Sequence, residues 1–202
     1  HSIVYYASWM DKYRDTPEFR NVEHVSYVDA DMQLVDTLRK GKTNCVVELM
    51  HAIDRLKDYR NMSDSLVRLN LMYVIHIVGD MHCPSHVKYP GCKSGRADLN
   101  GKKMSYHAMW DWGVLDGAHG WSYSEYRLLL DTFSKREKAG MAKGTPREWL
   151  YETAVACRVI YDWQRADGTY GKQFVTDTYL LPERQLILAS YRLAAVLNDL
   201  FG

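Results

Sequence analysis

The segment Ser63–His86 decides the fold, and it has the sequence Ser-Asp-Ser-Leu-Val-Arg-Leu-Asn-Leu-Met-Tyr-Val-Ile-His-Ile-Val-Gly-Asp-Met-His-Cys-Pro-Ser-His. Up to Asp80 it is apolar on nearly every face of a helix, which is typical of a helix buried in a protein core. We therefore predict a core helix over residues 63–80. His76 and Asp80 are four residues apart, so they lie on one face of that helix. A buried carboxylate or imidazole needs a partner, and a metal ion can be that partner.

A second pair of the same kind follows along the chain. His107 and Asp111 repeat the four-residue spacing on another expected helix, and His86 lies just after the helix break at Pro84. A single His or Asp in an apolar helix is more often a satisfied core residue than a ligand. Two such pairs with a flanking histidine instead favour a metal site. Imidazole nitrogens and carboxylate oxygens are ligands of zinc, although the spacing alone does not fix the number of ions.

Helix signals dominate the rest of the chain and predict one all-α domain over residues 1–202. Thr145–Glu148 has the pattern of a capping box with proline at the first helical position. No run of alternating apolar and polar residues predicts a strand. The loops 15–42 and 87–104 are expected to carry the binding surface. The further expected helices are 43–58, 122–140, 145–163 and one that begins at Pro182.

Composition limits the classes of function. With 26 Lys and Arg against 25 Asp and Glu, the chain has a net charge of +1 and no strongly basic nucleic-acid footprint. That does not exclude a nuclease whose contacts are metal ions and stacking aromatic rings, for which 15 Tyr and 6 Trp are candidates. No apolar run reaches the length of a membrane span. The 202 residues suffice for one domain with a substantial core.

These motifs resemble those of the zinc-dependent, single-strand-specific nucleases of the S1/P1 type, which share a superfamily with bacterial zinc phospholipase C. The resemblance spans almost the whole chain. It implies a single mainly helical domain of the phospholipase C/nuclease type, up to three zinc ions and a secreted or periplasmic protein, and we expect a monomer. The matching segments are Ser8–Asp11, Val25–Asp29, His76–His86, His107–Asp111, Trp149–Glu152, Gln185 and Arg192–Asn198.

The resemblance also implies a role for individual residues. Asp80 is implied to bridge two zinc ions. Asp11 is implied to orient the attacking water in addition to binding zinc, and Arg14 to balance the charge on the phosphate. Tyr27 and Asp29 are implied to line a pocket for a nucleotide base, the ring by stacking and the carboxylate by hydrogen bonding. The implied zinc ligands are Asp11, His76 and Asp80 for a first ion, and His86, His107 and Asp111 for another.

Three segments depart from the family. Its histidine ligand corresponds to Ser26 here, and a serine hydroxyl is a poor zinc ligand. His24 is an alternative ligand, because residues two apart in an extended segment face the same side. The family's N-terminal tryptophan, whose amine and carbonyl bind zinc, and the histidine ligand after it would precede His1, so we expect the N-terminal helix to be missing. The loop Gly91–Gly101 lacks the family's Gly-Gly-Asn segment, so no base preference carries over.

The four cysteines leave several disulfide pairings open. Cys83 and Cys92 flank the active-site loop, while Cys45 and Cys157 stand at positions that resemble family disulfides. For Cys83, a disulfide or simple burial is favoured over metal ligation. Three further histidines are expected to be structural or solvated, namely His51, His82 and His119.

The resemblance implies a metal-dependent endonuclease that hydrolyses single-stranded DNA or RNA to 5′-nucleotides, with 3′-nucleotidase activity alongside. A phospholipase C is the first alternative, but such enzymes resemble this motif with Glu at the position of Asp111. The second alternative is a degenerate relative that keeps zinc without catalysis, and Ser26 is its main support.

Overall fold

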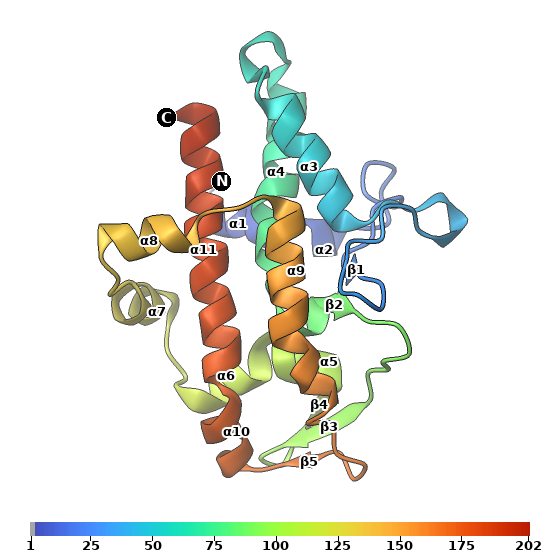
Figure 1. The fold of residues 1–202 in the computed structure, drawn as a ribbon, viewed down its shortest axis with the longest axis vertical. Coiled ribbons are helices and arrows are strands. Elements are labelled where there is room, and N and C mark those ends of the chain that lie inside the picture. Colours follow the sequence, from blue (N-terminus) through green and yellow to red (C-terminus); the bar gives the residue numbers. More distant parts are fainter. Residues whose placement is uncertain (1–2) are drawn as a thin grey trace.

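A computed structural model describes residues 3–202, and His1 and Ser2 lie outside the described residues. The described chain is mainly helical, as predicted, and its long helices run roughly along the longest axis of the molecule (Figure 1). These long helices are α3 (Cys45–Leu56), α4 (Asp64–Asp80), α9 (Pro146–Cys157) and α11 (Leu180–Phe201). The shorter helices are α1 (Ile3–Ala7), α2 (Trp9–Tyr13), α5 (Tyr106–Ala108), α6 (Val114–Ala118), α7 (Tyr123–Leu130), α8 (Lys135–Met141) and α10 (Lys172–Thr178).

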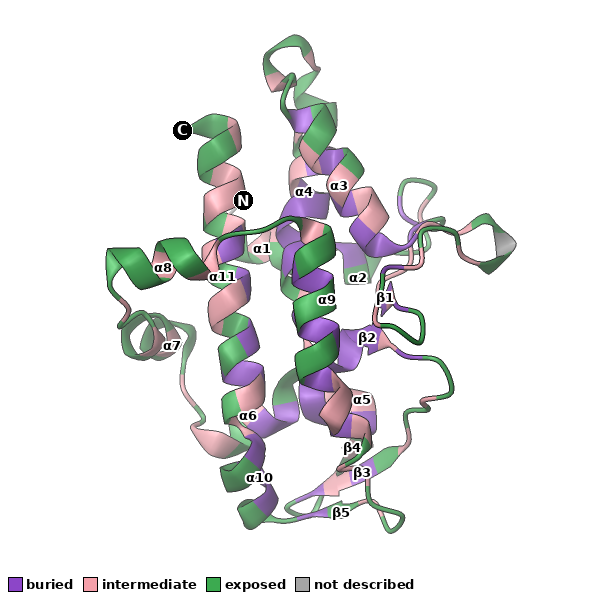
Figure 2. Cartoon of the chain, in the orientation of Figure 1, coloured by how far each residue is buried: buried purple, intermediate pink, exposed green. Residues whose placement is uncertain are grey.

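The predicted core helix is confirmed as α4, which begins after the N-cap Ser63. Its second half is almost continuously buried, and it carries His76 at 2% exposure. Helices α1, α2, α3 and α11 pack around it. Figure 2 shows buried residues through α4 and along one side of α9 and α11, whose other sides are exposed. This is the arrangement expected when amphipathic helices turn their apolar stripes toward one central apolar helix.

Two hydrophobic clusters form the core. The first lies around α3 and α4 and includes Trp149 of α9, and the second surrounds Trp110. The tight turn Pro84–His86 follows α4 and packs against both α9 and the segment that carries Trp110. The turn that carries His86 therefore lies where the two clusters meet.

The expectation that the chain has no strands is wrong, because short strands are present, most of them in the loops that were expected to carry the binding surface. β1 (Ser26–Tyr27) pairs in parallel with β2 (Val87–Lys88). β3 (Arg96–Leu99) pairs antiparallel with β4 (Lys102–Ser105) and parallel with β5 (Thr169–Tyr170). Strands of two to four residues are too short to show a period-two pattern. The hairpin does have a local signal, because Asn100 and Gly101 both adopt positive φ, at 53° and 85°, as a two-residue Asn-Gly hairpin turn requires.

Several helix boundaries also differ from the prediction. The helix expected over 122–140 is two helices, α7 and α8, because Ser134 and Glu137 form a second capping box that begins α8. The helix expected over 145–163 ends at Cys157 and continues as a tight turn, Arg158–Tyr161. The last helix begins at Leu180, two residues before Pro182, and the helix at Asp111 contains a π-helical turn, Met109–Gly113. The capping box at Thr145–Glu148 is confirmed.

All four cysteines lie among the described residues, and all have free thiols. The disulfides suggested by resemblance are therefore not formed in this structure. Cys45 instead lies against Ser26, with Sγ 3.3 Å from the serine Oγ. Cys83 lies 3.5 Å from a carboxylate oxygen of Asp111 rather than against Cys92.

A buried polar network joins the turn after α4 to α11. Arg192 is 2% exposed, and its Nη1 donates to Nε2 of His82 at 2.8 Å. His82 in turn donates from Nδ1 to the Val78 carbonyl at 2.7 Å, so it is a neutral ring, and its expected structural role is confirmed. Burial lowers the pKa of His82 to about 4, and the Arg192 charge acts in the same direction. Glu152 pairs with the same guanidinium.

We expect Arg192→Met to lower the free energy of unfolding by about 3 kcal/mol, because it leaves the buried His82 and the Glu152 carboxylate without their donor. Chemical denaturation measures the change. Arg184→Met is the matched control, since Arg184 is an exposed arginine of the same helix, and its effect should be within about 0.5 kcal/mol. Equal stabilities of the two variants would contradict this account of the network.

Candidate metal centre

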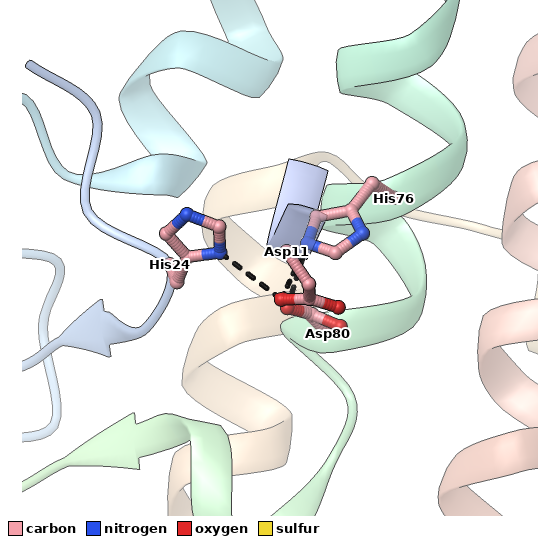
Figure 3. A group of neighbouring side chains, drawn as sticks. All are labelled: Asp11, His24, His76 and Asp80. Atoms are coloured by element: carbon pink, nitrogen blue, oxygen red, sulfur yellow. Dashed lines mark ion pairs between the residues drawn. The ribbon is translucent and has the colours of Figure 1, made fainter. Parts of the chain in front are cut away.

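The first donor group consists of Asp11, His24, His76 and Asp80, whose donor atoms all lie within 4.8 Å of one another. Figure 3 shows the two carboxylates facing the two imidazoles, with side chains from α2, from the bend before β1 and from α4. Nε2 of His76 lies 3.0 Å from Oδ2 of Asp80 and 3.9 Å from Oδ1 of Asp11. Nδ1 of His24 lies 3.3 Å from the same Asp11 oxygen. The first donor group thus gathers residues far apart in the sequence.

The structure distinguishes the two alternatives at His24 and Ser26. Ser26 is completely buried, and its hydroxyl lies 3.3 Å from the sulfur of Cys45. His24 lies in a bend rather than in the strand, so its side chain does not follow the alternation of β1. The sequence suggested His24 as an alternative ligand on the assumption of an extended segment, and that assumption does not explain its contact with Asp11. The bend does so instead.

The second donor group consists of Cys83, His86 and Asp111, again with donor atoms within 4.8 Å of one another. Nε2 of His86 lies 3.5 Å from Oδ1 of Asp111. His107 stacks on His86, with ring centroids 4.7 Å apart and planes at 15°. Asp80 links the two groups, because its Oδ2 is also 3.1 Å from Nδ1 of His86.

Buried donor atoms without hydrogen bonds show that a metal fits these residues. The atoms in question are Nδ1 and Nε2 of His24, Nε2 of His76, Oδ2 of Asp80, and Nδ1 and Nε2 of His86. Buried polar atoms nearly always have a partner, so such a concentration at one place needs an explanation. His76 is also oriented as a ligand would be, because its Nδ1 bonds to the Ala7 carbonyl at 2.6 Å and Nε2 faces the donor group. Cations held at the two donor groups would give a partner to Nε2 of His76, to Oδ2 of Asp80 and to one ring nitrogen each of His24 and His86.

Charges in the site are strongly coupled. Burial alone would lower the pKa of His76, but the adjacent carboxylate of Asp80 outweighs it and raises that pKa to about 9. Burial would also lower the pKa of His86, but the carboxylates of Asp80 and Asp111 outweigh this effect and raise that pKa. The pKa of Asp80 is lowered, because the two histidines outweigh its own burial. His24 lowers the pKa of Asp11. Both carboxylates are therefore ionised at neutral pH, whereas His76 holds a proton when no cation is bound.

Metal affinity is therefore expected to rise with pH, from about pH 6 to about pH 9, by about tenfold per pH unit for each proton displaced. A metal ligand must be a neutral imidazole, and His76, with a pKa of about 9, must release its proton on binding. Asp11 and Asp80, with lowered pKa values, contribute nothing to the slope in this range. Calorimetric zinc titrations in two buffers of different ionisation enthalpy count the released protons. An affinity independent of pH, with no proton release, would contradict the predicted protonation state.

The other predicted site residues lie near the donor groups without joining them. Arg14 is exposed at the end of α2, one helical turn after Asp11 and on the same side. Tyr27 is half-buried in β1 and pairs with Lys88 of β2, the strand that directly follows His86. Asp29 is exposed and accepts two backbone hydrogen bonds of 2.9 Å through Oδ1, which closes its own turn. The roles predicted for these three residues stay predictions.

Two histidines outside the donor groups have the structural or solvated roles expected of them. His119 stacks on Trp121 and pairs with the buried Glu183 at 2.5 Å. His51 is exposed on α3.

A mainly helical fold with a His/Asp cluster at the end of its core helix defines a protein of the phospholipase C/nuclease class. Residues 1–202 match the family model described as S1/P1 Nuclease. The chain belongs to this family of nucleases, which are phosphodiester hydrolases.

The relatives that the chain resembles carry nuclease names. Endonuclease 4 of Arabidopsis thaliana is 25% identical over 215 residues, which cover 94% of this chain and 69% of that protein. Endonuclease 2 of Arabidopsis thaliana is 27% identical over 184 residues, covering 80% and 63%. Nuclease S1 of Aspergillus oryzae is 28% identical over 155 residues, covering 71% and 53%. The matches thus cover between 53% and 69% of the length of these relatives.

Residues 3–202 contain no helix that combines the length and the apolar composition needed to cross a membrane.

Proposed function

We propose that this protein is a zinc-dependent phosphodiesterase that hydrolyses single-stranded DNA or RNA to 5′-nucleotides and also removes 3′-phosphates from nucleotides. The observation that carries the proposal is the pair of donor groups joined by Asp80, with its concentration of buried donor atoms that lack hydrogen bonds. Imidazole and carboxylate donors at a partly open site are the ligands of catalytic zinc. Family membership and the nuclease relatives support the same reaction class.

Zinc ions bound here would polarise the phosphate and lower the pKa of the attacking water. The protein's own part is to position these groups and to handle charge. His76 is buried, whereas the side chains of Asp11 and Asp111 are 59% and 42% exposed, so the substrate phosphate meets the site on the side of these carboxylates. Asp11 orients the attacking water through its carboxylate, which His24 holds in place. Arg14 balances the charge that develops on the phosphate oxygens.

The preference for single strands rests on Tyr27. A nucleotide base must leave its stack to lie against an aromatic ring, which costs least in a single strand. Tyr27 lies on β1, beside the strand that leaves His86, so a base on its ring has its phosphate near the second donor group. Asp29 is proposed to hydrogen-bond that base with the carboxylate oxygen that does not close the turn.

The two alternatives are weaker. Asp111 and the nuclease relatives disfavour a phospholipase C. The non-catalytic alternative depended on Ser26, and His24 supplies an imidazole at the first donor group in spite of that substitution. A secreted or periplasmic location and a monomeric state remain proposals by resemblance.

The test compares zinc-loaded protein with protein stripped by a chelator on three substrates: a single-stranded oligonucleotide, its duplex, and phosphatidylcholine vesicles. We expect zinc-dependent cleavage of the single strand, slower cleavage of the duplex, and products with 5′-phosphates. Lipid hydrolysis without oligonucleotide cleavage would favour the phospholipase, and no hydrolysis of any substrate would favour the non-catalytic relative.

A further inference from the structure

The thiol of Cys83 lies beside the other two members of the second donor group, His86 and Asp111. It is the N-cap of the tight turn Pro84–His86, and its carbonyl accepts from the amide of His86 at 3.0 Å. Cys83 itself has an extended backbone, with φ −69° and ψ 128°. In this arrangement the Cys83 sulfur, a ring nitrogen of His86 and a carboxylate oxygen of Asp111 lie within 4.8 Å of one another.

The hydrogen bonds of Cys83 are long and involve a weak donor and acceptor. Its Sγ lies 3.4 Å from the Ser85 hydroxyl, 3.5 Å from Oδ1 of Asp111 and 3.9 Å from the Trp110 carbonyl. The Ser85 hydroxyl can donate to the sulfur while the thiol donates its single proton to one of the two oxygen acceptors, and sulfur is weak in both roles.

His86 supplies an independent observation at the same point. It is 9% exposed, and its two buried ring nitrogens form no well-directed hydrogen bond; Nδ1 lies 3.1 Å from Asp80 and Nε2 lies 3.5 Å from Asp111. Its Nε2 faces Asp111, the residue that Cys83 also approaches. A sulfur, an imidazole nitrogen and a carboxylate oxygen thus converge, and these are the three kinds of zinc donor.

We propose that Cys83 is a thiolate ligand of the metal ion bound by His86 and Asp111, an inference that rests on the proposed metal centre. On binding, the Cys83 S–H bond breaks, the sulfur keeps the electron pair that binds the metal, and the proton passes to solvent. No oxidant or reductant takes part.

A thiolate ligand gives the second donor group a preference for certain metal ions. Sulfur ligands favour zinc and other soft or borderline ions over magnesium, calcium or manganese, which prefer oxygen donors. A coordinated thiolate is also shielded from alkylating reagents that attack free thiolates. Thiol chemistry at Cys83 should therefore depend on whether the metal is bound.

The test loads the protein with cobalt(II), which gives a near-ultraviolet charge-transfer absorption when a thiolate is bound. We expect this absorption in the wild-type protein, and we expect Cys83→Ser to lose it while it still binds cobalt. Cys92→Ser is the matched control, because Cys92 is also half-buried but belongs to neither donor group, and it should keep the absorption. A second readout on the wild-type protein is alkylation of Cys83, which zinc should slow at least about tenfold.

The outcomes separate this inference from the proposed function. Cobalt binding without the absorption in the wild-type protein, or an absorption that survives Cys83→Ser, overturns the role of Cys83 and leaves the metal centre intact. Alkylation of Cys83 that is unaffected by bound zinc does the same. Failure to bind cobalt or zinc overturns the metal centre, and the thiolate ligand with it.

Discussion

Asp80→Asn is expected to reduce the zinc bound by both donor groups and to slow cleavage of single-stranded DNA at least about a hundredfold. One oxygen of Asp80 lies 3.0 Å from Nε2 of His76 and 3.1 Å from Nδ1 of His86, so this carboxylate joins the two donor groups. Asparagine keeps the shape of the side chain but lacks the negative charge. A ligand shared by two cations needs that charge. Zinc content by elemental analysis and the initial cleavage rate measure the two effects.

The matched control is Asp54→Asn. Asp54 is an exposed aspartate on α3 that pairs with Lys57 at 3.0 Å, and exposed pairs of this kind contribute little. This control should keep both zinc content and cleavage rate. If Asp80→Asn bound as much zinc as the control and cleaved as fast, Asp80 would not link two metal sites.

His24→Ala is expected to have the second largest effect, weakening zinc binding and cleavage by about ten- to a hundredfold. The variant removes an imidazole whose two nitrogens are buried without hydrogen bonds beside Asp11. Ser26→Ala is the matched control, because it removes only a hydroxyl that contacts Cys45 outside the donor group. Competition between the protein and a zinc chelator gives the affinities.

The same pair of positions allows a stricter test. His24→Ala combined with Ser26→His restores the family's histidine in place of the one removed. We expect no recovery of zinc affinity, because Ser26 is completely buried and an imidazole there costs about 1–3 kcal/mol of overpacking. A double variant that regained zinc affinity would show that a histidine at position 26 can also reach the metal, which would contradict the argument from the burial of Ser26.

Local patterns predicted the centre of the fold, because the features concerned are short in range. The core helix follows from continuous apolar residues, and His76 and Asp80 follow from four-residue spacing on it. Two local signals were present but not used: the capping box of Ser134 and Glu137, which separates α7 from α8, and the Asn100–Gly101 turn.

The remaining features depend on contacts between distant segments. His24 reaches Asp11 through a bend in the chain. The strand after this bend, β1, pairs with β2, whose residues are more than sixty positions away. Neither contact is encoded in a local sequence pattern. Cys83 is a similar case, because its approach to Asp111 depends on how the turn after α4 packs against the π-helical turn at Asp111. Propensity and periodicity describe single elements, whereas these contacts are tertiary.

A zinc titration of the metal-free protein, with cleavage of a single-stranded oligonucleotide measured at every step, tests the metal-dependent nuclease most directly. We expect no cleavage without zinc and a rate that rises with added zinc until binding saturates. Zinc binding that saturates while the oligonucleotide stays intact would contradict this expectation, as would cleavage that proceeds at full rate in the presence of a chelator.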